Sequence, residues 1–222
     1  DEHGGTWTIK PQTVGGSSQV FASSVLGAAP QNYWRFGDAS GPDATNEVNG
    51  DQMTFVDGVT VANAGRFKDS TVATFDGSTG YADFVNDPST TGDAFVVDGG
   101  NQSVGLWFKT STPTGVLAAY QVADLASGAS PTSYVPMLYI GSDGKLRGEY
   151  WDGSTNALTS PGVVTDGKWH FVVLSATTSS QSLFLDGAQI ATRAGTPKFN
   201  DANLNQHGQF GAGFLRNWPA GT

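Results

Sequence analysis

The stretch "TDGKWHFVVLSATTSSQSLFLDG", residues 165–187, places two apolar runs on either side of a short polar segment. In the first run, Trp169, Phe171 and Val173 share one face, because successive side chains of a strand point to opposite sides. An Asp-Gly pair precedes the first run and another follows the second, and Asp-Gly suits tight turns because both residues tolerate positive φ. The stretch therefore predicts two antiparallel strands in the middle of a sheet.

His170 lies inside the first of these runs and is one of three histidines in the chain. A catalytic or metal-binding histidine needs partners, and no Ser, Cys or second His stands nearby at a suitable spacing. We therefore expect His170 to be a hydrogen-bonded residue of a strand.

The same pattern of short apolar runs and turns recurs along most of the chain. Asp-Gly pairs begin at positions 57, 76, 98, 143, 152, 166 and 186. The clearest hairpins are "LYIGSDGKLRGEY" (138–150) and "SLFLDGAQIAT" (182–192), and "NYWRF" (32–36) is a further predicted strand. About a dozen short strands without long helices predict an all-β fold, either an antiparallel sandwich or a barrel.

The polar residues 1–20 contain a Gly-Gly-Ser-Ser segment, which is typical of a linker or of the tail of a preceding module. Residues 21–222 then form the predicted domain. Within it, "FASSVLGAAP" (21–30) predicts a short helix that Gly27 ends and Pro30 stops.

Composition excludes several classes of partner. The formal net charge of −9 and the lack of any basic run argue against nucleic acid, which requires clustered Lys and Arg. No apolar run approaches the roughly 20 residues that span a bilayer, so we expect no membrane insertion. The chain has no cysteine, and its richness in Gly, Ser, Thr and Asp is typical of secreted or cell-surface proteins. The sequence opens at Asp1, so we expect that any export signal has been removed or lies outside this sequence.

Six segments resemble, in this order, the bacterial laminin G-like domains of the concanavalin A-like lectin/glucanase superfamily. They are "YWRFGDASG" (33–41), "FDGSTGYADF" (75–84), "SVGLWFKT" (103–110), "LYIGSDGKLRG" (138–148), "DGKWHFVVLS" (166–175) and "LFLDGAQIA" (183–191). The resemblance runs from about residue 20 to 214. It implies a jelly-roll β-sandwich of two antiparallel sheets, one concave and one convex.

The resemblance also implies a calcium loop after the opening strand, where the family has a stretch resembling Asp-Ser-Ser-Gly-Asn-Gly. Here the matching segment is "DATNEVNG" (43–50), with Asn46 at the aspartate position. We expect Asn46, Asn49 and Asp51 to offer oxygen atoms to a structural Ca²⁺, with an affinity weakened by the neutral Asn46. The alternative is a hydrogen-bonded, Asn-rich turn.

Domains of this family close with a strand resembling Phe-x-Gly-x-Ile-Asp-Glu-Val-x-x-Tyr. The stretch "GQFGAGFLRNWPAGT" (208–222) resembles the segment that comes before it. This predicts a sandwich that lacks its closing strand, or one that receives a complementing strand from another polypeptide.

Aromatic side chains near turns are the candidate ligand contacts, because rings stack on the apolar faces of sugars. The candidates are Tyr150, Trp151, Trp218, Tyr120 and Tyr134. For each of them, packing in the core or at its rim is the alternative.

The superfamily includes glycanases, whose laminarinase-like members carry a Glu-x-Asp-x-x-Glu pattern that this chain lacks. The nearest carboxylate pair, Glu149 and Asp152, is three residues apart, so a strand would send the two side chains to opposite faces. We therefore predict no catalytic residues, and a carbohydrate-binding or adhesion module of a larger secreted protein that contacts a glycan or a surface protein. A structural spacer or protein-interaction domain is the alternative, and a glycoside hydrolase is the least favoured function.

Overall fold

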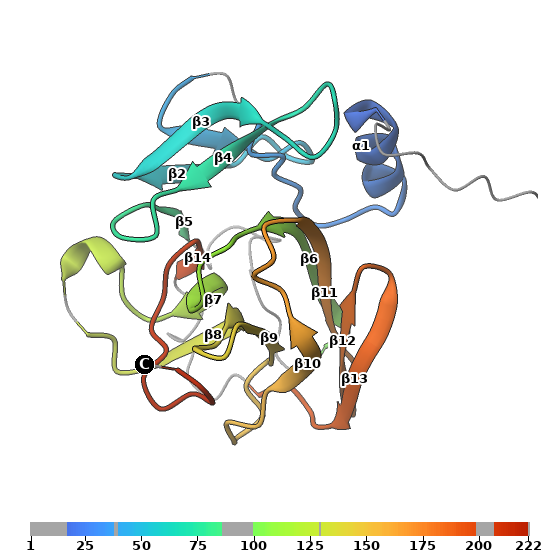
Figure 1. The fold of residues 1–222 in the computed structure, drawn as a ribbon, viewed down its shortest axis with the longest axis vertical. Helices are drawn as coiled ribbons and strands as arrows, with labels where there is room; N and C mark the ends of the chain where they lie inside the picture. Colours follow the sequence, from blue (N-terminus) through green and yellow to red (C-terminus); the bar gives the residue numbers. More distant parts are fainter. Residues whose placement is uncertain (1–16, 38–39, 86–99, 129, 199–206, 222) are drawn as a thin grey trace, which may run out of the picture.

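The computed structural model describes residues 17–37, 40–85, 100–128, 130–198 and 207–221. Within these ranges, an eight-stranded and a four-stranded antiparallel sheet pack face to face, with a small hairpin and one helix at one end of the molecule (Figure 1). This arrangement confirms the predicted all-β sandwich.

The larger sheet has the order β1-β2-β5-β14-β7-β8-β9-β10. Its strands are β1 (Asp43–Thr45), β2 (Gln52–Val56), β5 (Tyr81–Val85), β14 (His207–Phe210), β7 (Gly115–Gln121), β8 (Tyr134–Ile140), β9 (Lys145–Gly148) and β10 (Leu158–Val163). The smaller sheet has the order β13-β12-β11-β6. Its strands are β13 (Ala188–Ala194), β12 (Ser180–Leu185), β11 (Trp169–Ala176) and β6 (Gln102–Lys109). The hairpin pairs β3 (Val59–Ala64) with β4 (Thr71–Phe75).

Alternating burial along the strands builds the core between the two sheets. In β11, Val172 and Leu174 are fully buried, whereas Phe171 and Val173 are half-buried on the outer face. β11 pairs with β12 through Val172 and Leu185, which confirms the hairpin predicted for this stretch. Long apolar side chains from both sheets therefore meet in one core.

Turn chemistry accounts for the tight connections. Asp186 and Gly187, between β12 and β13, have φ values of 51° and 86°. Two consecutive positive φ values are what a two-residue turn between twisted strands requires. The predicted β8–β9 hairpin is also present, with Ile140 opposite Leu146.

β14 occupies the middle of the larger sheet although it is the last strand in the chain. It pairs with β5 through Gln209 and Asp83, and with β7 through Gln209 and Ala119. The strand thus joins β1-β2-β5 to β7-β8-β9-β10.

Helix α1 (Ser18–Gly27) begins earlier than the sequence predicts. The Ser17 side chain caps its first turn, and Asp69 accepts hydrogen bonds from the Ser17 hydroxyl (2.9 Å) and the Ser18 N–H (2.7 Å). Residues 18–20, predicted as linker, are therefore helical, while residues 1–16 lie outside the described part of the chain. Phe21 packs on Trp107, so the helix covers one end of the outer face of the smaller sheet.

The segment "NYWRF" is not a strand. Trp34 makes an isolated bridge to Asn46, and the positive φ of Phe36 (52°) breaks the extended backbone. At ten residues, α1 is too short to span a bilayer, and the described residues form no helix that could do so.

Candidate functional site

Two predicted ligand contacts, Tyr150 and Tyr120, are inside the core. Tyr150 is 2 % exposed and Tyr120 is fully buried. The Tyr150 hydroxyl donates to the Leu174 carbonyl (3.4 Å), and the Tyr120 hydroxyl accepts the Trp151 N–H (3.1 Å). Burial raises the pKa of both phenols. The prediction of surface stacking by these two residues is wrong, because Tyr120 is buried within β7 and Tyr150, just after β9, is held in the core by hydrogen bonds to Gln181 and Leu174.

The other three aromatic candidates fasten the C-terminal segment to the larger sheet. The Trp218 ring packs against Trp151, with ring centroids 6.3 Å apart. Trp218 is only 6 % exposed, so it cannot serve as a ligand contact. The Tyr134 hydroxyl donates to the Arg216 carbonyl (2.6 Å). Trp151 and Tyr134 remain partly exposed, so a ligand contact there stays a prediction.

The Asn46 side chain is 1 % exposed and fully used by the protein. Its Oδ1 accepts the N–H groups of Tyr33 and Val48, each at 3.0 Å, and its Nδ2 donates to Asn32 Oδ1 (2.7 Å). A carbonyl oxygen has two lone pairs, so Asn46 has none left for a metal ion. The predicted role of Asn46 as a calcium ligand is therefore wrong.

Asn49 and Asp51 bind each other in the same loop. Asn49 Nδ2 donates to Asp51 Oδ2 (2.5 Å), and the Asp51 N–H donates to Asn49 Oδ1 (3.1 Å). Asn46 therefore drops out of the donor set predicted for Ca²⁺, and the loop has the hydrogen bonds of the alternative, an Asn-rich turn. Calcium binding by Asn49 and Asp51 stays a prediction.

His170 lies in β11 with a carboxylate on each ring nitrogen. Nδ1 lies 2.8 Å from Asp186 Oδ2, and Nε2 lies 3.1 Å from Asp166 Oδ1. Partial burial by itself lowers the pKa of His170, but the two carboxylates outweigh it and the net pKa is raised. These contacts tie β11 to the turn that precedes it and to the turn between β12 and β13, as expected for a structural histidine.

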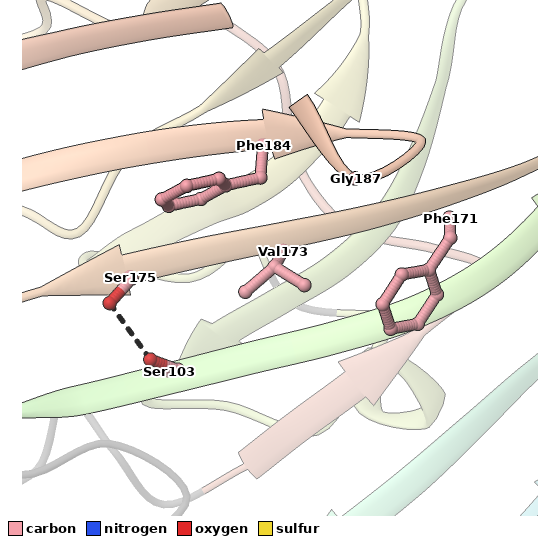
Figure 2. A pocket seen from close by; sticks show the side chains of 6 residues that line it. All are labelled: Ser103, Phe171, Val173, Ser175, Phe184 and Gly187. Atoms are coloured by element: carbon pink, nitrogen blue, oxygen red, sulfur yellow. Dashed lines mark hydrogen bonds between the residues drawn. The ribbon is translucent and has the colours of Figure 1, made fainter. Parts of the chain in front are cut away.

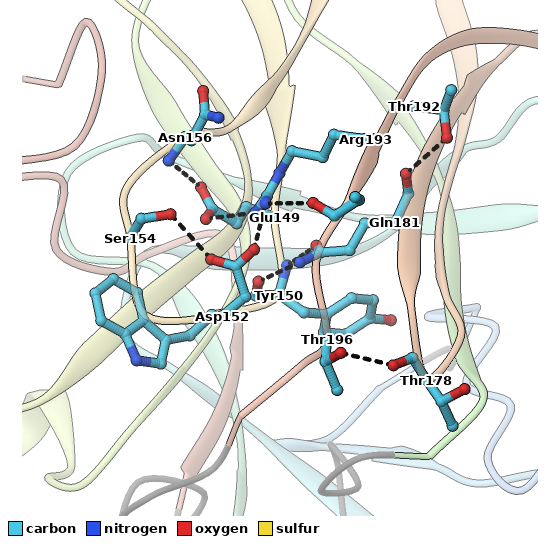
Figure 3. A network of polar contacts seen from close by, with 12 residues as sticks. Glu149, Tyr150, Asp152, Ser154, Asn156, Thr178, Gln181, Thr192, Arg193 and Thr196 are labelled. Carbon is cyan, nitrogen blue, oxygen red and sulfur yellow. Dashed lines mark hydrogen bonds and ion pairs between the residues drawn. The ribbon is translucent and has the colours of Figure 1, made fainter.

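A buried polar network joins the end of β9 to β13 (Figure 3). Glu149 is fully buried, accepts from Arg193 Nη2 (2.7 Å) and accepts the Asn156 N–H (2.9 Å). Arg193 Nη1 also donates to Asp152. The prediction that Glu149 and Asp152 diverge is wrong, because the chain leaves β9 before Asp152 and strand alternation no longer applies.

The two carboxylates of this network have different acidities. Burial raises the pKa of Glu149 to about 7, against the opposing effect of Arg193. Burial also disfavours ionised Asp152, but hydrogen bonds from Arg193 and Ser154 prevail and lower its pKa. A glycosidase places the sugar between its two carboxylates. Here the Arg193 guanidinium bridges them, so the network is suited to joining the sheets.

Gln181 forms a second link between the sheets in the same region (Figure 3). Its fully buried side chain accepts the Tyr150 N–H through Oε1 (2.8 Å) and donates to the Tyr150 carbonyl through Nε2 (2.8 Å). The sequence could have indicated this buried glutamine, because Gln181 stands two residues before Leu183 and therefore shares the face of β12 that points to the core.

A shallow groove of about 280 Å³ lies on the outer face of the smaller sheet (Figure 2). Its lining residues are Ser103, Phe171, Val173, Ser175, Phe184 and Gly187. The two phenyl rings flank Val173, and the hydroxyls of Ser103 and Ser175 bind each other (2.9 Å). An apolar floor with hydroxyls at one end can hold a flat, partly apolar ligand.

Gly105 shapes the floor of this groove. A Cβ atom at Gly105 would lie 3.3 Å from both the Phe171 ring and a Val173 methyl group. The glycine therefore lets these side chains lie low over β6. The sequence analysis placed Phe171 and Val173 on one face of a strand but did not indicate that this face is partly open.

A family model described as "Concanavalin A-like lectin/glucanases superfamily", named Laminin_G_3, matches residues 76–219. The chain belongs to this laminin G-like family. The match confirms the resemblance on which the fold prediction rested.

Solved structures with the same laminin G-like fold include enzymes and binding domains. A mutant of Trypanosoma rangeli sialidase displaying trans-sialidase activity has a TM-score of 0.56 and 14 % identity, covering 90 % of this chain and 31 % of that chain. The binding domain of botulinum neurotoxin DC in complex with rat synaptotagmin II has a TM-score of 0.50 and 9 % identity, covering 82 % and 43 %.

Mouse laminin α1 domains LG4-5 have a TM-score of 0.40 and 15 % identity, covering 59 % of this chain and 31 % of that chain. The laminin G-like chain thus spans about a third of the length of the laminin and sialidase chains it matches. A search of curated protein sequences found no significant match. At these identities the likeness shows the fold alone.

Proposed function

We propose that this laminin G-like domain is a non-catalytic carbohydrate-binding or adhesion module of a larger secreted or cell-surface bacterial protein. The groove between Phe171 and Phe184 is its glycan site. The observation that carries the proposal is the half-exposed apolar floor, which has a pair of serine hydroxyls at one end. The lectin members of the superfamily support a glycan ligand, and the neurotoxin binding domain solved with synaptotagmin II supports adhesion to a protein.

The chemistry of the groove favours a neutral sugar. The C–H face of a pyranose packs on aromatic rings, and its hydroxyls bond to polar groups such as those of Ser103 and Ser175. None of the six lining residues is charged, and the chain as a whole is acidic. An anionic sugar would find no Lys or Arg partner in this groove.

Phe184→Ala should weaken the binding of a neutral oligosaccharide at least tenfold, because it removes one of the two stacking rings. Tenfold corresponds to about 1.4 kcal/mol, within the range expected for an aromatic contact. A glycan array would select the ligand, and isothermal titration calorimetry would compare the variants. Val163→Ala is the matched control, since Val163 is 60 % exposed on β10, in the other sheet.

Trp151→Ala tests one of the two candidates from the sequence, Trp151 and Tyr134, that remain partly exposed. If Trp151→Ala abolishes binding while Phe184→Ala does not, the site lies at Trp151 and the groove assignment is wrong. We expect no release of reducing sugar from the selected glycan. Release that disappears in Glu149→Gln would instead establish a hydrolase.

A second function, that of a domain completed by a strand from another polypeptide, is favoured by the edge of β6. Among the described residues, β6 pairs only with β11. Val104 and Leu106, which pack against the core, are only half-buried. Apolar side chains that face a core yet remain half-exposed are expected where a neighbouring strand can be added.

A synthetic peptide with the family's closing-strand pattern should raise the melting temperature of the domain under this second function. Binding to the folded state alone stabilises it by about 2.7 kcal/mol at a hundredfold excess over Kd. The control peptide carries the same residues with proline at alternate positions, which removes ladder hydrogen bonds. Equal melting temperatures of the domain with the two peptides would contradict strand completion.

A further inference from the structure

We propose that Asp83, Asp124 and His207 form a binding site for a divalent transition-metal cation on the outer face of the larger sheet. Asp83 lies on β5, His207 on β14, and Asp124 precedes the 3₁₀ helix η1 (Leu125–Ser127) in the loop that follows β7. One potential ligand atom from each lies within 4.8 Å of the others. All three side chains are part-buried.

The spacing between His207 and Asp83 fits a first-row cation. His207 Nδ1 lies 3.1 Å from Asp83 Oδ2 and 3.3 Å from Asp83 Oδ1. Two ligands about 2.0–2.1 Å from a tetrahedral Zn²⁺ ion are about 3.3 Å apart. Asp124 is oriented by hydrogen bonds to its Oδ1 from the Tyr81 hydroxyl (3.2 Å) and the Ala126 N–H (2.9 Å).

The amide of Gln209 gives an independent indication of a cation. Gln209 is two residues from His207 on β14 and directly opposite Asp83, so its side chain shares their face of the sheet. Nε2 donates to Asp83 Oδ1 (3.1 Å), which holds the amide beside the carboxylate. Oε1 is buried and has no hydrogen-bond partner among the described residues.

Gln121, on β7 at the other side of β14, also has a buried amide oxygen without a partner among the described residues. It stands opposite His207, and its Nε2 donates to the Ala123 carbonyl (2.5 Å), one residue before Asp124. Its Oε1 is likewise buried and lacks a hydrogen-bond partner within the described part of the chain. A buried carbonyl oxygen without a partner is unfavourable and uncommon in folded proteins, so two of them on the face of the sheet that carries this cluster point to a missing positive group.

A protonated His207 paired with Asp83 accounts for only part of this cluster. That ion pair satisfies Asp83 but leaves the oxygens of Gln121 and Gln209 without donors. A cation among the three side chains meets the carboxylates on the face of the sheet that also carries Gln121 and Gln209.

The ligand types favour zinc or manganese over calcium. Imidazole suits Zn²⁺ and other transition metals, carboxylate and carbonyl oxygens suit Mn²⁺, and calcium takes oxygen ligands. Such an ion would tie the loop after β7 to β5 and β14. The site is separate from the loop at residues 43–51 and from the groove on the smaller sheet.

The test is titration of the EDTA-treated, dialysed protein with ZnCl₂ and MnCl₂ by calorimetry, together with a thermal melt at each metal concentration. We expect one ion per chain from Zn²⁺ or Mn²⁺ and a rise in melting temperature. Asp83→Asn and His207→Asn should each weaken that binding at least tenfold. His170→Asn is the matched control, because each nitrogen of His170 already faces a separate carboxylate. His3→Asn controls for binding at the N-terminal residues.

Wild-type affinity in both Asp83→Asn and His207→Asn would overturn the proposal. So would binding lost only in His3→Asn, or binding of CaCl₂ with neither transition metal bound. Because a variant can fail to fold, wild-type protein loaded with Co²⁺ supplies a second measurement. Its visible absorption should show one nitrogen ligand among oxygen ligands, and the spectrum of the aqueous ion would contradict the site.

Discussion

Replacing Gln181 with methionine should lower the free energy of unfolding by about 3 kcal/mol. Methionine keeps the length of the side chain but removes both hydrogen bonds to the Tyr150 backbone. The Tyr150 N–H and carbonyl would then be buried without these partners, and each such group costs about 1–3 kcal/mol. Urea denaturation followed by tryptophan fluorescence would measure the change.

Ser182→Ala is the matched control on the same strand. The Ser182 hydroxyl bonds to Thr192 Oγ1 (3.0 Å) on the outer face of the smaller sheet, so its loss should change stability by less than about 0.5 kcal/mol. If the two variants have the same denaturation midpoint, Gln181 is not the link between the sheets that its geometry indicates.

Arg193→Met should destabilise the protein by about 3 kcal/mol at pH 8 and by less at pH 5. Removing the guanidinium leaves the buried Glu149 carboxylate without its cation, and breaking a buried pair in this way typically costs about 3–5 kcal/mol. At low pH the Glu149 carboxyl takes up a proton, which removes much of that penalty. Urea unfolding at both pH values would check this.

The sign of the pH dependence follows from the raised pKa of Glu149. In the folded protein this pKa is about 7, against 4.5 for an ordinary glutamate, so the folded state binds more protons between these values. The contribution of Glu149 to stability therefore decreases as the pH rises from about 4.5 to about 7. Glu149→Gln should remove this slope. An equal loss in Arg193→Met at pH 5 and pH 8 would contradict the assignment.

The local features of the fold could be predicted from the sequence. Asp-Gly pairs and alternating apolar runs located the β8–β9 and β12–β13 hairpins, because these features depend on residues close together in the chain. The end of α1 at Gly27 followed from the same local signals. The family resemblance supplied the two-sheet arrangement.

The candidate sites depended on contacts between distant residues, which one sequence does not reveal. Asp83 and His207 are 124 residues apart, and only the insertion of β14 beside β5 brings them together. Tyr150 was expected near the surface because it stands beside a turn, but its contacts with Gln181, 31 residues away, hold it in the core. Similarly, Asn46 was expected to bind a metal, but the approach of Asn32 and Tyr33 buries it.

The central place of β14 has a consequence for folding on the ribosome. Until residues 207–210 are available, β5 and β7 each lack a partner along one edge, and the larger sheet stays in two parts. A nascent chain that stalls before this point exposes two strand edges, which favour association with other chains. We therefore expect the closing of the larger sheet to be slow, because it forms pairings between strands far apart in the chain.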